Sequence, residues 1–108
     1  MGLASSQLRL IYLTMFKSDL EYRIQLITQT KMHLSGSIND LVDAGSDLDP
    51  SAPEMKLLEQ RRERLHLVEK KLDATIERYK TQLSAIQTEI EAAQKFVDNN
   101  VKSFNYAK

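Results

Sequence analysis

Residues 72–104 read LDATIERYKTQLSAIQTEIEAAQKFVDNNVKSF, and this stretch decides the fold. Its apolar residues are separated by alternating gaps of four and three residues. They are Leu72, Ile76, Tyr79, Leu83, Ile86, Ile90, Ala93, Val97 and Phe104, with Asn100 as one polar step. A repeat of 3.5 residues places these side chains along one side of a helix, where they require a partner helix.

An earlier stretch has the same repeat. Its members are Leu20, Ile24, Ile27, Leu34, Ile38 and Leu41, with Lys31 as the polar step. The segment GSDLDPSAP at 45–53 lies between the two repeats and has the glycine and prolines of a connector. The sequence therefore predicts one all-α domain over 1–108, a coiled-coil-like antiparallel two-helix hairpin with helices at 5–43 and 52–104 and a turn at 44–52.

Local signals indicate where these helices begin and end. Ser5 and Ser6 are suitable N-caps for the first helix, and Gly45 suits a left-handed residue at its end. Ser51 is a suitable cap for the second helix, and Pro53 fits its first turn. Within the first helix, Gly36 weakens the helical conformation, so we expect a soft point there.

The two predicted helices differ in length, and this difference leaves apolar residues without a partner. If residue 43 lies opposite residue 53, Lys31 lies opposite Leu65, and the chain after Ala93 extends beyond the first helix by about 20 Å. At the other terminus, residues 8–16 are apolar on most sides of the helix. We expect these open-end segments to contact other copies of the chain or a helical partner protein, because monomers rarely expose such patches. The expected contact residues are Leu8, Ile11, Met15, Phe16, Phe96, Val97, Val101 and Phe104.

Composition restricts the function classes. Lys+Arg and Asp+Glu each number 15, which gives a net charge of zero and argues against nucleic-acid binding driven by bulk charge. There are no cysteines, so disulfides and thiolate metal sites are excluded. The longest apolar run, residues 8–16, is shorter than the ~20 residues of a membrane span and lacks the features of a cleaved signal peptide. The compartment stays open: the cytoplasm, or the cell surface through a route without a cleaved signal.

No arrangement of chemically active residues stands out. The sequence contains no phosphate loop and no helical His-Glu-x-x-His, and we predict no catalytic, cofactor or metal site. His33 and His66 lie off the apolar repeat, so we interpret them as solvated rather than as metal ligands. Lys31 and Glu69 replace apolar residues of the repeat, and either they form an ion pair that fixes the register or their charged groups extend into water.

The connector and the second predicted helix resemble the type III secretion needle subunits. The turn Asp49-Pro-Ser-Ala-Pro53 is similar to the Pro-Ser-x-Pro turn of that family, and Val101-Lys-Ser-Phe104 is similar to its apolar C-terminal tail. The chain is longer than a usual needle subunit and continues past Phe104. The resemblance implies a bacterial, non-enzymatic structural subunit that forms a helical filament or appendage; the alternative is a small coiled-coil adaptor or secretion chaperone.

Overall fold

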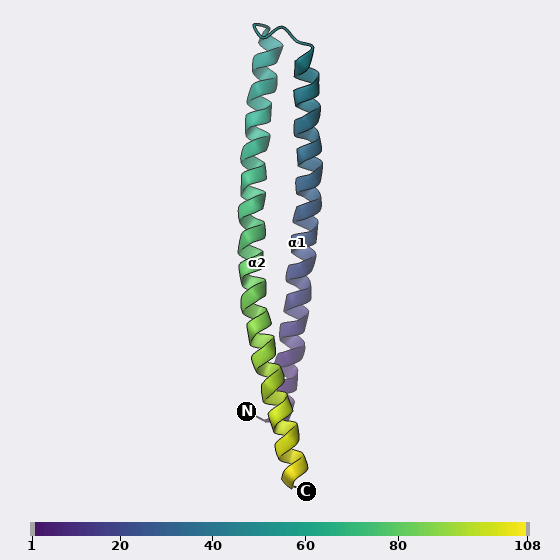
Figure 1. Cartoon of the computed structure of the whole chain (residues 1–108), viewed down its shortest axis with the longest axis vertical. Helices are drawn as coiled ribbons and strands as arrows, with labels where there is room; N and C mark the ends of the chain where they lie inside the picture. The colour runs from purple at the N-terminus through teal and green to yellow at the C-terminus, as the bar shows by residue number, and fades with distance from the viewer. Residues whose placement is uncertain (1, 108) are drawn as a thin grey trace. The chain divides into compact units, whose positions relative to one another are not determined.

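The computed structural model describes residues 2–107, with side chains for residues 2–103. It contains two helices, α1 (Leu3–Ser46) and α2 (Pro53–Ala107), which form an antiparallel hairpin (Figure 1). No strand occurs among the described residues. The predicted all-α helical hairpin is confirmed.

The chain divides into two compact units, and each contains part of both helices. The turn unit, Ile24–Arg78, holds the connector and the halves of α1 and α2 that flank it. The terminal unit consists of Met1–Arg23 and Tyr79–Lys108. It therefore contains the first half of α1, the second half of α2 and all eight residues predicted for assembly.

The helices pack through a seam that follows the predicted repeat. In the turn unit, Ile38 and Ile76 are 6% and 8% exposed. In the terminal unit, Leu13, Leu20 and Ala93 are buried in the same way. The repeat in α1 is longer than the predicted one, which covered Leu20 to Leu41. Every position of α1 from Leu3 to Gly45 that follows the three–four spacing is buried or partly buried. These seam positions are Leu3, Ser6, Leu10, Leu13, Lys17, Leu20, Ile24, Ile27, Lys31, Leu34, Ile38, Leu41 and Gly45.

Helix α1 is longer than predicted at both ends. Ser6 lies inside its first turns and donates its hydroxyl to the Gly2 carbonyl oxygen at 3.1 Å, so the predicted N-cap at Ser5 or Ser6 is wrong. Gly45 is helical, with no positive φ, so the predicted left-handed end is also wrong. The helix continues without a break through Gly36, where a soft point was expected.

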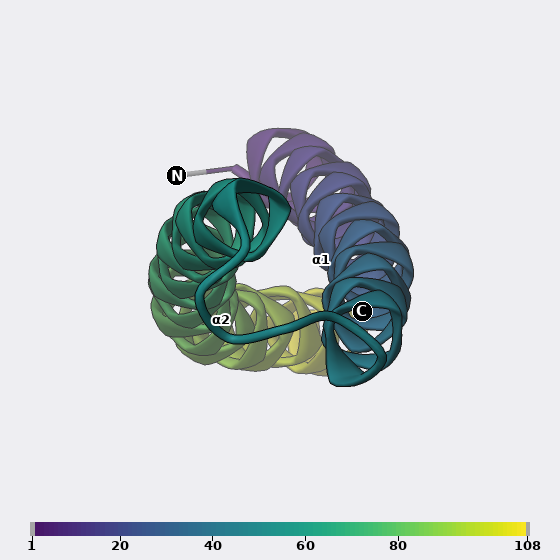
Figure 2. The ribbon, with the colours of Figure 1, turned by 90° about the horizontal axis from the view of Figure 1, so that it is seen from above.

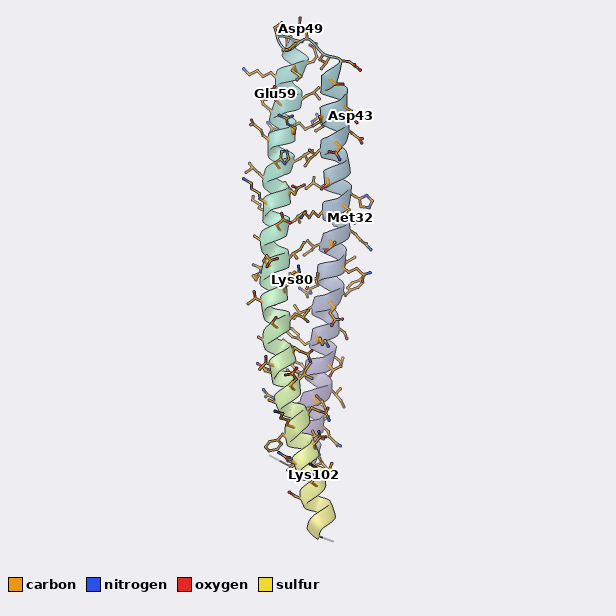
Figure 3. The ribbon with its side chains drawn as sticks, viewed as in Figure 1. Met32, Asp43, Asp49, Glu59, Lys80 and Lys102 are labelled. Atoms are coloured by element: carbon orange, nitrogen blue, oxygen red, sulfur yellow. The ribbon has the colours of Figure 1, made fainter. Side chains whose placement is uncertain are left out.

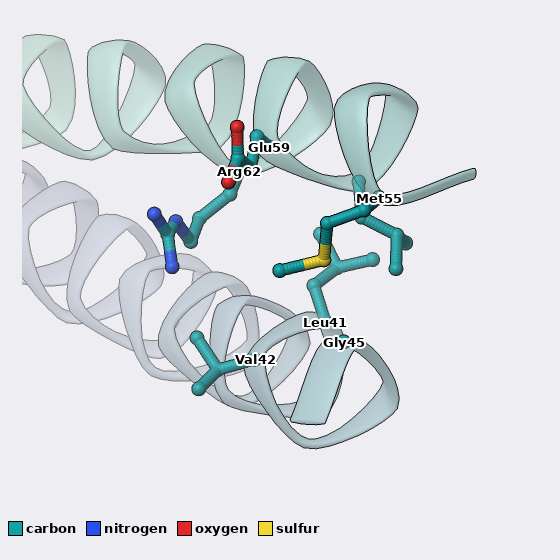
Figure 4. Close-up of a pocket in the computed structure, with 7 residues that line it drawn as sticks. Leu41, Val42, Gly45, Met55, Glu59 and Arg62 are labelled. Carbon is teal, nitrogen blue, oxygen red and sulfur yellow. The ribbon is translucent and has the colours of Figure 1, made fainter. Parts of the chain in front are cut away.

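Gly45 has a packing role in the turn unit. A β-carbon added at this position would lie 3.4 Å from the Met55 sulfur and 3.8 Å from a Leu58 methyl carbon. Figure 4 shows the Met55 side chain extending from α2 toward α1 beside Gly45. Both distances are ordinary van der Waals distances, so Gly45 is a buried helical position of the seam that lies beside the first apolar residues of α2.

The connector, residues 47–52, joins the two helices (Figure 2), and the Asp49 side chain lies within it (Figure 3). The Asp49 Oδ1 accepts hydrogen bonds from the Ser51 backbone N–H at 3.0 Å and the Ser51 hydroxyl at 2.9 Å. These bonds, the backbone one first, lower the pKa of Asp49 below its usual value. Ser51 therefore bonds to Asp49 instead of capping α2, while Pro53 begins that helix as predicted.

The register of the turn unit differs from the predicted one. The Lys31 ammonium forms an ion pair with Asp73 Oδ1 at 2.5 Å, and Ser35 donates its hydroxyl to Glu69 at 3.1 Å. Lys31 was expected opposite Leu65, so its partner lies about two helical turns further along α2. Of the two alternatives for Lys31, an ion pair forms, but its partner is Asp73 and not Glu69.

The Asp49 bonds predict a specific acid dependence. A carboxyl group whose pKa is lowered in the folded state stabilises the fold above its unfolded pKa of about 3.9, and this stabilisation disappears as the pH falls through the folded pKa. We expect Asp49→Asn to unfold at a lower temperature than the wild type at pH 6, with the difference closing as the pH falls below 4. Thermal unfolding followed by circular dichroism measures it; a difference that is independent of pH would contradict the role of the charge.

The Lys31–Asp73 pair predicts a charge-swap effect on the seam. Asp73→Lys places two cations side by side, so we expect a lower melting temperature that rises again with salt. The double variant Lys31→Asp with Asp73→Lys restores the opposite charges and should recover most of the loss. Melting curves of the three proteins test this, and equal destabilisation by the single and double variants would show that the pair does not form.

Candidate assembly surface

Four side chains of α1 in the terminal unit are apolar or aromatic and strongly exposed. Leu8 is 67% exposed, Ile11 57%, Tyr12 69% and Met15 67%. We call these four residues the outer stripe. Tyr22, 59% exposed, continues the same face toward the turn unit.

The helical repeat explains why these residues lie together. Ile11 and Tyr12 are each three or four residues from both Leu8 and Met15, and this spacing brings side chains to one face of a helix. Met15 is separated from the buried seam residue Leu13 by two residues, which is more than half of a helical turn. The outer stripe therefore lies on the side of α1 opposite the seam, and α2 does not cover it.

The face that carries the outer stripe has no charge over most of its length. Its remaining residues before Asp19 are Ala4, Ser5 and Ser18, all exposed and uncharged. The nearby cations lie elsewhere on the helix: Arg9 forms an ion pair with Glu89 of α2 at 3.6 Å, and Lys17 occupies a seam position. A face this uncharged and apolar differs from the polar surface expected on the solvent side of a helix.

The solvent side of α2 in the terminal unit is more polar than that of α1. The exposed residues that lie opposite its seam are polar or charged except for two alanines, and none is a large apolar side chain. They are Ser84, Ala85, Thr88, Glu91, Ala92, Lys95, Asp98, Asn99 and Lys102. Of the two outer faces in this unit, the face of α1 is therefore the apolar one.

Polar contacts hold the terminal unit together next to the outer stripe. The Arg23 guanidinium contacts Asp19 at 2.9 Å and also forms a hydrogen bond with Tyr79 of α2. The bond with Tyr79 and then the Asp19 charge raise the pKa of Arg23, so its positive charge is retained. Together with the pair formed by Arg9 and Glu89, this contact links α1 to α2 beside Leu8 and again about two helical turns beyond Met15.

The predicted C-terminal contact residues have different environments. Phe96 and Val101 are 41% and 40% exposed, whereas Val97 is 8% exposed and belongs to the seam. Phe104 lies outside the residues whose side chains are described. The expectation that the chain overhangs from Ala93 onward is therefore wrong: the register is shifted, and α2 still lies alongside α1 at Val97.

A shallow groove marks this part of the terminal unit. It is lined by small residues from both helices and by two larger side chains at its rim: Ser6, Ala92, Ala93, Arg9 and Phe96. Because Ser6 shares this groove with Phe96, α2 extends beyond the start of α1 only from about Asn99 onward. The last described seam position, Asn100, has a buried amide nitrogen with no acceptor among the described residues.

The structure thus brings three of the predicted contact residues together in the outer stripe and places the others outside it. It also adds one residue that was not predicted. Leu8, Ile11 and Met15 lie in the outer stripe, and Phe16 flanks it at 39% exposure. Sequence reasoning missed Tyr12, which the same helical spacing identifies once seam and non-seam positions are considered separately.

The histidines lie away from this surface. His33 and His66 are exposed in the turn unit, and His66 lines a shallow depression with Glu63, Leu67 and Lys70. The described residues contain no group of three or more His, Cys, Asp or Glu side chains suited to hold a metal ion. Over the same residues, neither helix has a stretch long and apolar enough to cross a membrane.

Comparison of the chain with family models, with curated proteins and with solved structures found no match. The resemblance to needle subunits therefore rests on the residues of the connector and of α2. It remains a prediction from the sequence.

Truncation of a seam residue should lower the free energy of unfolding much more than truncation of an outer-stripe residue. Leu13→Ala removes a side chain that is 6% exposed, so we expect a loss of roughly 2–3 kcal/mol in unfolding free energy. Leu8→Ala, at a position 67% exposed, should change it by less than about 0.5 kcal/mol at dilute protein concentration. Urea unfolding of both variants provides the measurement, and similar losses would show that the outer stripe packs within one chain.

Proposed function

We propose that the protein is a structural subunit that assembles with other copies of itself through its terminal unit. The observation that supports this most is the outer stripe, because its four side chains contribute little to the fold of one chain. Apolar surface that stays in water is unfavourable, and its burial drives most protein association.

Further features are consistent with this proposal. The net charge is zero, so no long-range repulsion opposes the approach of two copies. Phe96 and Val101 expose additional apolar surface on α2 in the same unit. The form of the assembly that we propose, a filament, appendage or secretion-needle-like structure, follows from the resemblance of the connector and of α2.

Sedimentation velocity tests the proposal over concentrations from the low micromolar range to tens of micromolar. We expect the wild type to shift to larger species as concentration rises. The variant Leu8→Ser with Met15→Ser should stay monomeric and keep its helical circular dichroism signal, because both side chains are exposed in one chain.

A matched control comes from the turn unit, where Leu57 and Leu67 are 66% and 59% exposed. Leu57→Ser with Leu67→Ser removes the same kind of surface and should assemble like the wild type. If both double variants weaken assembly equally, association is not specific to the terminal unit. A wild type that remains monomeric at tens of micromolar would contradict self-assembly and favour the adaptor alternative, in which the same surface binds a different helical protein.

A further inference from the structure

We infer that the first contact between two copies is a symmetric, antiparallel pairing of the outer stripe with the outer stripe of the second copy. This inference rests on the proposed function. It adds the partner surface and its orientation, neither of which the proposal of self-assembly specifies.

The partner surface follows from the contrast between the two helices of the terminal unit. The outer stripe requires an apolar counterpart, but the exposed face of α2 carries Glu91, Lys95 and Asp98 in its central part. Placing the outer stripe on that face would remove charges from water without a partner, which is unfavourable. The outer stripe of a second copy is apolar along the same length, so it provides the matching surface, and a two-fold symmetric contact uses one surface twice.

Charge determines the orientation. The outer face of α1 is uncharged from Ala4 to Ser18, and its first charged residue is Asp19. In a parallel symmetric pair, each residue faces its own equivalent, so Asp19 would lie beside Asp19 of the second copy. In an antiparallel pair the uncharged segment covers itself, with the two-fold axis between Ile11 and Tyr12. Each Asp19 then lies opposite Ala4 of the second copy, at the edge of the contact and far from the other Asp19.

This register determines which residues of the two copies lie opposite each other. Leu8 of one copy lies opposite Met15 of the second copy, and Ile11 lies opposite Tyr12 of the second copy, next to the two-fold axis. Leu8 does not face Leu8 of the second copy, because the two positions are separated along the helix axis by seven residues, or about 10 Å.

The positions of the two apolar faces of α1 determine how four helices would be arranged. The seam, with Leu10 and Leu13, and the outer stripe, with Leu8 and Met15, lie on opposite sides of the helix. A helix with two opposite apolar faces fits between two neighbours in one layer. The paired copies would therefore place the two α1 helices next to each other in the middle and one α2 helix on each side.

The surface available is sufficient for a specific pair. The exposed parts of Leu8, Ile11, Tyr12 and Met15 amount to roughly 600 Å² per copy, so these residues of two copies would bury at most about 1,200 Å², the lower limit of stable interfaces. The patch also reaches the upper end of the roughly 300–600 Å² that a typical monomer exposes. Its extent supports a concentration-dependent dimer rather than an obligate one.

Disulfide trapping tests the orientation, and the absence of native cysteines makes every cross-link assignable. Three single variants are prepared from the full chain: Leu8→Cys, Met15→Cys and, as a collision control in the turn unit, Leu67→Cys. Each is oxidised alone, and Leu8→Cys is also oxidised after mixing with a mass-tagged Met15→Cys protein. Sedimentation of the reduced proteins is measured in parallel.

We expect the mixture of Leu8→Cys and Met15→Cys to give about tenfold more mixed disulfide than either variant gives with itself, because only opposed positions bring Cα atoms within about 7 Å. Oligomers with efficient Leu8–Leu8 and Met15–Met15 cross-links would overturn the antiparallel register while leaving self-assembly intact. Oligomers in which all pairs cross-link no better than Leu67→Cys would show that the outer stripe is not the contact. Monomeric reduced proteins would contradict the proposed function itself.

Discussion

The structure depends on one constraint: each helix of the hairpin has a single partner, so a seam on one side is all the apolar surface that one chain can bury. The three–four spacing supplies this seam in both helices and brings Leu20, Ile38 and Ile76 into it. Polar side chains also meet across the seam, as Lys31 does in its ion pair with Asp73. Any apolar residue outside the spacing remains in water, and for this reason the outer stripe of α1 is significant.

The seam was predictable from the sequence because hydrophobic spacing is a local property, whereas the register depends on the geometry of the connector and on pairings distant in sequence. Gly45 illustrates this difference. As an isolated glycine before a proline-containing segment it indicates a helix end, but in the structure it is helical and buried beside Met55 and Leu58. The resulting change in register moves Val97 from the expected overhang into the seam, and the predicted Lys31–Glu69 pair becomes Lys31 with Asp73.

The candidate surface was predictable in part for the same reason. An excess of apolar residues near the N-terminus identified Leu8, Ile11 and Met15 as uncovered, and this conclusion did not require the register. Tyr12 was missed because the apolar residues at 8–16 include the seam residues Leu10 and Leu13. The outer stripe becomes recognisable only when these seam residues are set apart. The C-terminal residues required the register, so Phe96 and Val97 were grouped although their exposures differ fivefold, at 41% and 8%.

The contrast between the two outer faces also limits what kind of assembly one surface can build. A two-fold contact uses the outer stripe of both copies, and it ends growth because no second stripe remains. A filament requires a further, different surface on each pair of copies. Among the described side chains of the terminal unit, the large exposed apolar ones that remain outside such a contact are Phe16, Tyr22, Phe96 and Val101. Growth beyond a pair would therefore depend on contacts at the flanks and at the end of α2, and substitutions there should stop elongation without separating the pair.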